Sequence, residues 1–287
     1  MTLAANYQFE AIGTQWSIET ERPLSSSLIA RLQKLIDSFD QTYSRFRNDS
    51  LVTKARSAPG SYSFPESTTK IFDTYDKLSA VTRGAVNPLV GESLEALGYD
   101  AAYSLKQTNL HKAPKYPESL TRNGSLITTK EPLLIDIGAI GKGYLIDELA
   151  EIVSAEHPHY VIDGSGDMAI HTKEPETIGL EDPREAGRVI GHVSLGKGSL
   201  CASAVNRRAW GEDLHHVVDA RTGEPTRNII ATWAMADSTM LADALTTALF
   251  FTSPEELMKT FGSFNYAIMN ADGSVAHNIT TIGELYS

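Results

Sequence analysis

The segment HHVVDARTGEP, from His215 to Pro225, concentrates side chains suited to proton transfer and phosphoryl chemistry. Histidine titrates near neutral pH, so His215 or His216 can accept or donate a proton under working conditions. The two valines that follow predict the end of a strand, and the polar residues around Gly223 predict a turn. The pattern is ambiguous by itself, because a surface hairpin with hydrogen-bonded histidines has the same sequence features.

A second set of chemically useful residues lies in LADALTTALFF, residues 241–251, where the apolar spacing predicts a helix. Asp243 and Thr247 are four positions apart and therefore share one helix face. Carboxylate and hydroxyl oxygens are ligands that magnesium prefers, and a set of only two leaves room for water and substrate phosphate. The alternative is that Thr247 bonds back to the helix backbone while Asp243 faces water.

A glycine-rich turn carries a third candidate group. The sequence predicts a strand at LLIDI (133–137), a turn at GAIGKG and an amphipathic helix at YLIDELAEIV. The turn is not a nucleotide P-loop, because Gly143 follows Lys142 where a Ser or Thr would hold magnesium. It still lets the backbone approach a ligand, with helix amides and the Lys142 charge directed at it. A plain strand-to-helix turn with an exposed lysine is the alternative.

Two further segments are less specific. GSGDMA (164–169) follows a predicted strand and matches a dinucleotide fingerprint, but the next residues include Pro175 and lack helical periodicity, which excludes a Rossmann unit. A glycine turn that packs closely against a ligand remains an option there. Arg207 and Arg208 either bind an anion or are simply solvated. Cys201 is expected to be a small buried residue rather than a nucleophile.

The elements that must position these groups alternate without a regular βαβ order, which favours an α+β fold. A strand pair is predicted over 7–20, broken at Gly13, and helices over 65–82 and after the capping residues Ser25–Ser27. Further helices are predicted after Asp237 or Ser238 and after Ser253. A hairpin around residues 272–273 closes the chain.

Composition limits the classes of function. The chain has 287 residues, 41% of them hydrophobic, which is ordinary for a globular protein. Its net charge of −11 argues against nucleic-acid binding, because no basic stripe is available to neutralise phosphates. A single cysteine excludes an internal disulfide and a cysteine-based metal site. With no signal-peptide pattern and no apolar window of membrane-spanning length, we expect a soluble, cytoplasmic protein.

Taken in order, these segments resemble the flavin transferase family often called ApbE, the FAD:protein FMN transferases, from about residue 9 to residue 252. The matching motifs are IGTQW (12–16), QTYSRFRNDSLVTK (41–54), GAVNPLVG (84–91), DIGAIGKGYLID (136–147), HHVVDARTG (215–223) and ADALTTA (242–248). Ile12, Asn87 and Ala220 stand where the family usually has methionine, aspartate and proline. Ala202 and Ala204 replace its usual threonine and glycine. These departures affect the expected loop shape and target recognition.

The resemblance implies one α+β domain over residues 1–287, with a mixed, mainly antiparallel sheet and flanking helices. It implies magnesium bound by the side chains of Asp243 and Thr247 and the backbone carbonyl of Ala139. His216 aligns with the family's catalytic histidine. The residues that would contact the flavin are Ile12, Tyr43, Ala85, Val86, Asn87, Asp136, Lys142 and Val217.

The implied reaction is the magnesium-dependent transfer of FMN from FAD to a Thr or Ser hydroxyl of a target flavoprotein, with release of AMP. Bound magnesium would also explain how a chain of net charge −11 holds an anionic substrate. Two alternatives remain at this point. One is a pyrophosphatase that splits FAD into FMN and AMP, and the other is a non-catalytic flavin-binding protein.

Overall fold

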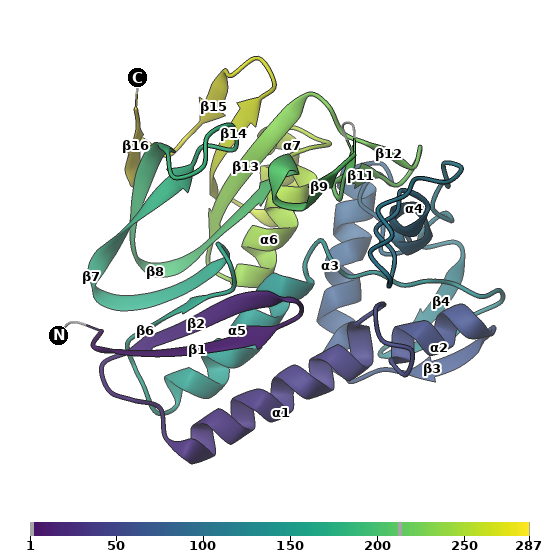
Figure 1. Ribbon diagram of the computed structural model, residues 1–287, viewed down its shortest axis with the longest axis horizontal. Coiled ribbons are helices and arrows are strands. Elements are labelled where there is room, and N and C mark those ends of the chain that lie inside the picture. Colours follow the sequence, from purple (N-terminus) through teal and green to yellow (C-terminus); the bar gives the residue numbers. More distant parts are fainter. Residues whose placement is uncertain (1–2, 212–213, 287) are drawn as a thin grey trace.

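A large antiparallel sheet occupies one half of the molecule (Figure 1). The computed structural model describes residues 3–211 and 214–286. The sheet order is β1-β2-β6-β7-β8-β13-β14-β15, and β16 also pairs with β8. These strands are β1 (Ala5–Ala11), β2 (Thr14–Thr20), β6 (Tyr160–Asp163), β7 (Met168–Glu181), β8 (Val189–Ala204), β13 (Ile229–Ala236), β14 (Asn265–Asn270), β15 (Val275–His277) and β16 (Gly283–Leu285). The predicted α+β class with a mainly antiparallel sheet is confirmed.

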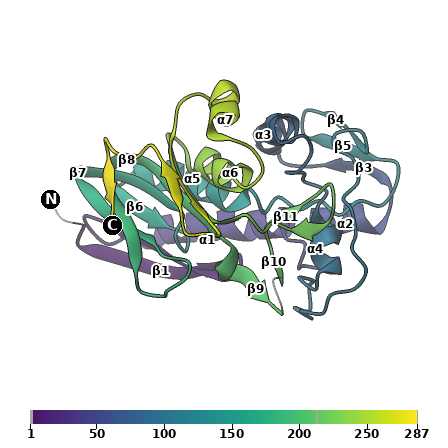
Figure 2. The ribbon, with the colours of Figure 1, turned by 90° about the horizontal axis from the view of Figure 1, so that it is seen from above.

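Helices α5 (Gly141–Ser154) and α6 (Thr239–Ala248) pack against each other and against the large sheet, α6 on β8 and β13 (Figures 1 and 2). Helix α1 (Ser26–Tyr43) packs against α5, and α7 (Pro254–Phe261) packs against α3 (Thr68–Val81). The main apolar core runs between these helices and the sheet, and it includes Ile18, Leu32, Leu145 and Leu245. This arrangement brings the start of α5 beside α6.

The other half of the molecule holds short elements around a small sheet (Figure 2). That sheet has the order β3-β5-β4, with β3 (Gly60–Ser63), β4 (Leu120–Asn123) and β5 (Leu126–Thr129), and the helices nearby are α2 (Leu51–Ser57) and α4 (Gly91–Ala96). Between the halves lie a 3-10 turn (Val205–Arg208) and two short strand pairs, β9 (Ala209–Trp210) with β10 (Leu214–His215) and β11 (Val218–Asp219) with β12 (Glu224–Pro225).

Local signals in the sequence set several element boundaries. The side chains of Ser25, Ser238 and Ser253 accept the backbone N–H three residues on, so each caps its helix as predicted. Such a cap stabilises a helix by about 1 kcal/mol. The predicted strand pair also forms, as β1 and β2 joined at Ile12 and Gly13. The closing hairpin forms as β14 and β15.

The prediction of a strand at LLIDI (133–137) is wrong. The segment is buried and makes no ladder: Leu133 N–H donates to the carbonyl of Ala55, and Asp136 N–H donates to the carbonyl of Pro88. A short buried apolar run needs partners for its backbone groups, and here the end of helix α2 and a loop supply them in place of a neighbouring strand. The helix that follows begins at Gly141, which places Lys142 in its first turn.

The absence of a helical pattern after GSGDMA is confirmed, because β7 follows that turn directly and excludes a Rossmann unit. Within the described ranges, no helix combines the length and apolar character needed to cross a membrane.

Candidate active site

The first turn of α5 lies directly on α6. Gly143 N–H donates to Asp243 Oδ2 at 2.9 Å, although the two residues are 100 positions apart. A Cβ at residue 143 would collide with the carbonyl oxygen of Thr239, so only glycine allows this approach. The contact joins the GAIGKG turn at the start of α5 to helix α6, which carries Asp243 and Thr247. These two motifs are far apart in the sequence.

A buried group of charges forms where these helices meet β8. Lys142 Nζ lies 2.9 Å from Asp167 Oδ2, and Asp167 Oδ1 accepts the N–H of Ala202 at 3.0 Å. Asp167 is 1% exposed and Asp243 is 5% exposed. We call Lys142, Asp167 and Asp243 the buried charge cluster.

Electrostatics within the buried charge cluster favour an additional cation. Burial and the nearby Asp167 carboxylate raise the pKa of Asp243 well above its usual range, and Lys142 only partly opposes this. Burial lowers the pKa of Lys142, but the Asp167 and Asp243 carboxylates outweigh burial and leave that pKa raised. The raised pKa of Asp243 reflects the cost of a second carboxylate charge in a poorly solvated place, and a bound cation would offset that cost and favour the ionised form.

Asp243 and Thr247 carry oxygen atoms of the kind that the predicted magnesium site requires. The alternative, with Thr247 bonded back and Asp243 in water, does not hold: Asp243 is buried, and it is Thr246 whose hydroxyl donates to the Asp243 carbonyl, at 2.8 Å. Among the described residues, neither Asp243 Oδ1 nor the Thr247 hydroxyl makes a hydrogen bond. Ala139 lies just before α5 and its carbonyl would complete an all-oxygen donor set of the kind magnesium prefers.

The two histidines of the HHVVDARTGEP segment have different environments. His215 Nε2 lies 2.9 Å from the Thr226 carbonyl, and its Nδ1 accepts the N–H of Val217 at 3.2 Å. These bonds give His215 a structural role, holding its strand to the segment that follows β12. Val217 itself is buried at this point.

His216 is chemically more available. Burial, followed by the charge of Arg208 and the neighbouring His215, lowers the pKa of His216 to about 3. The ring bonds to the Arg208 backbone, and Nδ1 is buried with no hydrogen-bond partner among the described residues. Lys142 also lowers this pKa, so His216 lies within electrostatic reach of the buried charge cluster. A neutral imidazole with one unpaired nitrogen can act as a base.

The expected flavin contacts at residues 85–87 lie beside the histidine segment. Ala220 N–H donates to the Ala85 carbonyl at 3.1 Å, and the Ala220 carbonyl accepts the N–H of Ala113. Proline, usual at position 220 in the family, has no N–H to donate. Asn87 uses its side chain within the loop, donating to the Pro114 carbonyl and accepting from Leu89 N–H, both at 2.8 Å. Val86 is buried.

Other expected flavin contacts occupy different surroundings. Tyr43 is buried at the end of α1, and its hydroxyl lies 2.5 Å from Thr68 Oγ1, within the aromatic packing of Phe64. Ile12 is half-buried at the tip of the β1–β2 hairpin with φ of 43°. A left-handed β-branched residue costs about 1–3 kcal/mol, and such strain often marks functional positions. The role of each in flavin contact remains a prediction.

The structure adds Arg45 to the site through Asp136. Arg45 Nε donates to Asp136 Oδ2 at 2.6 Å, while Gly138 N–H donates to Asp136 Oδ1 at 2.7 Å. The buried guanidinium lies 4.2 Å from the ring centre of Phe46 and 4.8 Å from that of Tyr99. The sequence carries no spacing signal for this contact, because Arg45 and Asp136 are 91 positions apart.

The sequence offers a partial signal for Asp167, as the last residue of the GSGD turn. Of the two arginines after β8, Arg207 forms an ion pair with Glu181, whereas Arg208 influences His216. Cys201 is fully buried, and burial raises the pKa of its thiol well above the usual range, which agrees with the expected non-nucleophilic role.

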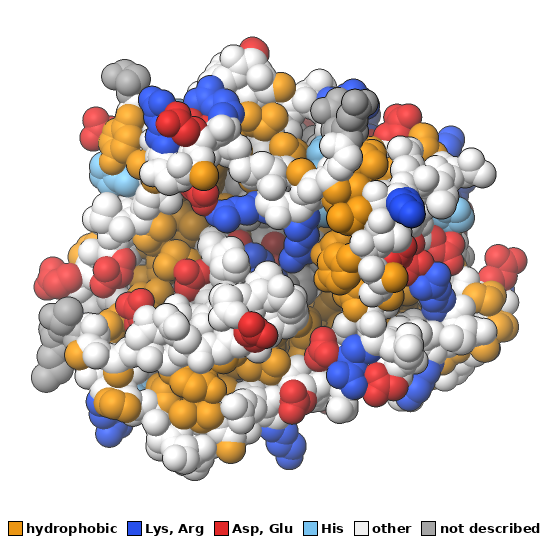
Figure 3. Space-filling model, viewed as in Figure 1, with side chains coloured by type: hydrophobic (Ala, Val, Ile, Leu, Met, Phe, Trp, Pro, Cys, Tyr) orange, Lys and Arg blue, Asp and Glu red, His pale blue; other side chains and the backbone are white. Residues whose placement is uncertain are grey.

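The face shown in Figure 3 has a hollow near its centre, with basic side chains around it and acidic side chains deeper inside. Apolar side chains flank the hollow. This combination suits a ligand that has both anionic and aromatic parts.

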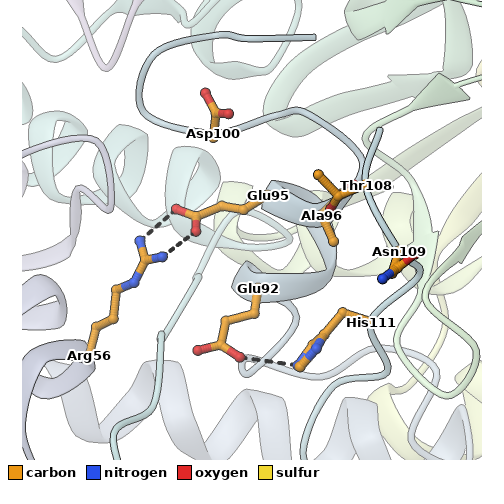
Figure 4. A pocket seen from close by; sticks show the side chains of 8 residues that line it. All are labelled: Arg56, Glu92, Glu95, Ala96, Asp100, Thr108, Asn109 and His111. Atoms are coloured by element: carbon orange, nitrogen blue, oxygen red, sulfur yellow. Dashed lines mark hydrogen bonds and ion pairs between the residues drawn. The ribbon is translucent and has the colours of Figure 1, made fainter. Parts of the chain in front are cut away.

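A separate pocket of about 420 Å³ lies at α4 (Figure 4). Two close pairs line it: Arg56 donates to both Glu95 oxygens at 2.8 and 2.5 Å, and His111 Nε2 lies 3.1 Å from Glu92 Oε2. No expected site residue lines it, so it lies outside the candidate site.

Comparison with known proteins gives a consistent result. The sequence profile of the ApbE family matches residues 12–269. A protein of Escherichia coli (strain K12) named FAD:protein FMN transferase is 23% identical, over 96% of this chain and 84% of the relative. One of the same name from Klebsiella pneumoniae (strain 342) is 21% identical, over 86% of this chain and 78% of the relative. A third, from Rhodobacter capsulatus, is 27% identical over 71% of this chain, and the match spans only 42% of that relative.

Solved structures share the fold. The crystal structure of the ApbE protein of Thermotoga maritima superposes with a TM-score of 0.80 at 22% identity, over 96% of this chain and 97% of the other. A mutant of the flavin transferase ApbE of Vibrio cholerae has a TM-score of 0.79 at 18% identity, over 97% and 99% of the two chains.

Proposed function

Because the chain belongs to the ApbE family, we propose that it is a transferase that moves FMN from FAD to a Thr or Ser hydroxyl of a target flavoprotein and releases AMP. The observation that carries this proposal is a neutral His216, with one unbonded ring nitrogen, within electrostatic reach of Lys142 in the buried charge cluster. A base and an anion-binding group are the two things that phosphoryl transfer to a hydroxyl requires.

In the proposed reaction, the acceptor hydroxyl oxygen attacks the phosphorus of the FMN half of FAD. The bond from that phosphorus to the oxygen of the AMP half breaks, and AMP leaves. His216 takes the hydroxyl proton on its imidazole, which is unprotonated at neutral pH.

Lys142, Asp243 and Thr247 would hold the diphosphate end of the substrate. Lys142 supplies a fixed positive charge, and the oxygens of Asp243, Thr247 and Ala139 would hold magnesium. Bound magnesium would offset the diphosphate charge and stabilise the transition state. Asp136, held by Arg45, would contact the flavin together with the chain around Ala85.

The deciding experiment incubates the chain with FAD, magnesium and a candidate acceptor flavoprotein, followed by intact mass of the acceptor and quantification of AMP. We expect a mass gain equal to FMN, equimolar AMP, and loss of both with a chelator. An acceptor with its Thr or Ser replaced by alanine serves as the matched control.

Other outcomes would contradict the proposal in distinct ways. Release of AMP and free FMN without acceptor labelling would indicate a pyrophosphatase. Bound FAD with no AMP release would indicate a non-catalytic flavin-binding protein.

A further inference from the structure

The turn between β6 and β7 holds the backbone of Asp167 in one position. Gly164 N–H donates to the Asp167 carbonyl at 2.8 Å, and Gly166 N–H donates to Asp163 Oδ1 at 2.7 Å. Ser165 has φ of 60°, a left-handed conformation that only strong local constraints maintain. A Cβ at Gly164 would press on Trp16 and Ile146, so the turn also packs tightly against the core.

The carboxylate of Asp167 is held as firmly as its backbone. One oxygen accepts the N–H of Ala202 on β8, and the other lies 2.9 Å from Lys142 Nζ. The Asp167 side chain is 1% exposed, whereas the Lys142 side chain is 20% exposed. A ligand at the protein surface can therefore contact the Lys142 side chain but not that of Asp167.

Stability alone is a poor reason for this arrangement. A buried ion pair gains little over apolar packing, because desolvation offsets the attraction. Here the Asp243 carboxylate also lies close enough to repel Asp167. A lysine side chain has many rotamers, and a fixed carboxylate beneath it selects one of them.

We propose that Asp167 is a positioning residue that fixes the ammonium of Lys142 where it binds an anionic phosphate group of FAD. This inference rests on the proposed function for the identity of the ligand. Asp167 does not touch the substrate, and its effect on binding passes through Lys142.

The test measures FAD affinity by flavin fluorescence at one pH for the wild type, Asp167→Asn, Lys142→Met and the double variant. Asparagine keeps the shape and the acceptor for Ala202 N–H, and removes the charge that holds Lys142. We expect Asp167→Asn to weaken binding by about tenfold, as for other partners that orient a binding group. In the Lys142→Met background the same change should have no further effect.

Asp182→Asn is the matched control. Asp182 is also buried, on the loop after β7, and also accepts a backbone N–H and pairs with a basic residue, Arg184 at 2.8 Å. It lies outside the candidate site, so its replacement should leave FAD affinity unchanged.

Three results would overturn the inference: unchanged affinity in Asp167→Asn, tighter binding in that variant, or an equal loss in both backgrounds. Tighter binding would mean that the carboxylate acts by repelling the anion. If Asp167→Asn does not fold, Asp167→Glu keeps the charge but moves it, and unchanged affinity there would equally overturn the inference. If the wild type binds FAD but does not transfer FMN, the proposed function is refuted. The FAD affinities of the wild type, the two single variants and the double variant would still decide the role of Asp167.

Discussion

Replacing His216 with glutamine should make the stability of the protein less sensitive to acid. Burial lowers the pKa of His216 to about 3 in the folded protein, against about 6.5 for an unfolded histidine. Below the unfolded pKa, the unfolded chain binds a proton that the folded protein does not. Stability is therefore lost as the pH falls from about 6.5 towards about 3, and the loss is absent in the glutamine variant.

The size of the effect follows from the difference in proton binding. At about pH 5.5 the unfolded histidine gains about 1.4 kcal/mol from protonation, and at about pH 7.5 only about 0.1 kcal/mol. The folded protein gains almost nothing at either pH. The result does not depend on the folded pKa in detail, because any value below about 4.5 leaves the imidazole neutral at about pH 5.5.

Urea unfolding of the wild type, His216→Gln and the control His192→Gln at these two pH values measures the difference. The wild type should lose about 1.3 kcal/mol more than His216→Gln on acidification. His192 lies on β8 opposite β16, with Nδ1 2.9 Å from the Tyr286 hydroxyl, so its variant controls for the loss of a histidine outside the candidate site. Equal losses in the wild type and His216→Gln would refute the buried, neutral state of His216.

The same neutral state has a kinetic consequence. With an ordinary imidazole as the base, kcat/KM would fall about tenfold from about pH 7.5 to about pH 5.5, because the base becomes protonated. His216 stays neutral over this range and should add no such fall. His216→Gln should bind FAD normally and lose about 10²–10⁴-fold in FMN transfer. Normal transfer by this variant would exclude His216 as the base.

Three further changes test the surroundings. Asp243→Ala should reduce magnesium-dependent transfer by more than about 100-fold, and activity indifferent to both this change and chelator would contradict the metal assignment. Gly143→Ala should cost about 1–3 kcal/mol of unfolding free energy by collision with Thr239, measured by urea unfolding; an unchanged midpoint would refute the close approach. Tyr43→Phe should cost about 0.5–1.5 kcal/mol of unfolding free energy through the lost bond to Thr68, measured by urea unfolding, and an unchanged midpoint would refute that contribution.

Local chemistry explains what the sequence predicts well. The serines at 25, 238 and 253 cap their helices because a cap needs only its own first turn, and Gly13 ends a strand for equally local reasons. The prediction at LLIDI fails because burial is visible in the sequence but the hydrogen-bond partner is not. Its partners are the carbonyl of Ala55 in helix α2 and that of Pro88 in a loop, both far earlier in the chain.

The same distinction separates the predicted and unpredicted parts of the site. Asp243 and Thr247 follow from spacing on one helix, whereas the bond from Gly143 to Asp243 depends on how two helices cross. The role of Asp167 depends on its contact with Lys142, and that of Arg45 on its contact with Asp136; only the fold brings these residues together. The side-chain partners of Asp167 lie outside its own turn, so the sequence around it gives no pattern from which its role can be predicted.

Ala220 shows how a departure from the family pattern can carry structural information. A proline at that position would fix the turn through its ring but would leave the Ala85 carbonyl without its donor. Alanine supplies the N–H, and its own carbonyl accepts from Ala113, so the turn is tied to two other segments instead of being stiffened internally. One of these ties runs to the loop expected to contact the flavin. The histidine segment is therefore tied through Ala220 to the backbone at Ala85, where flavin contact is predicted, and the sequence shows this tie only as a missing proline.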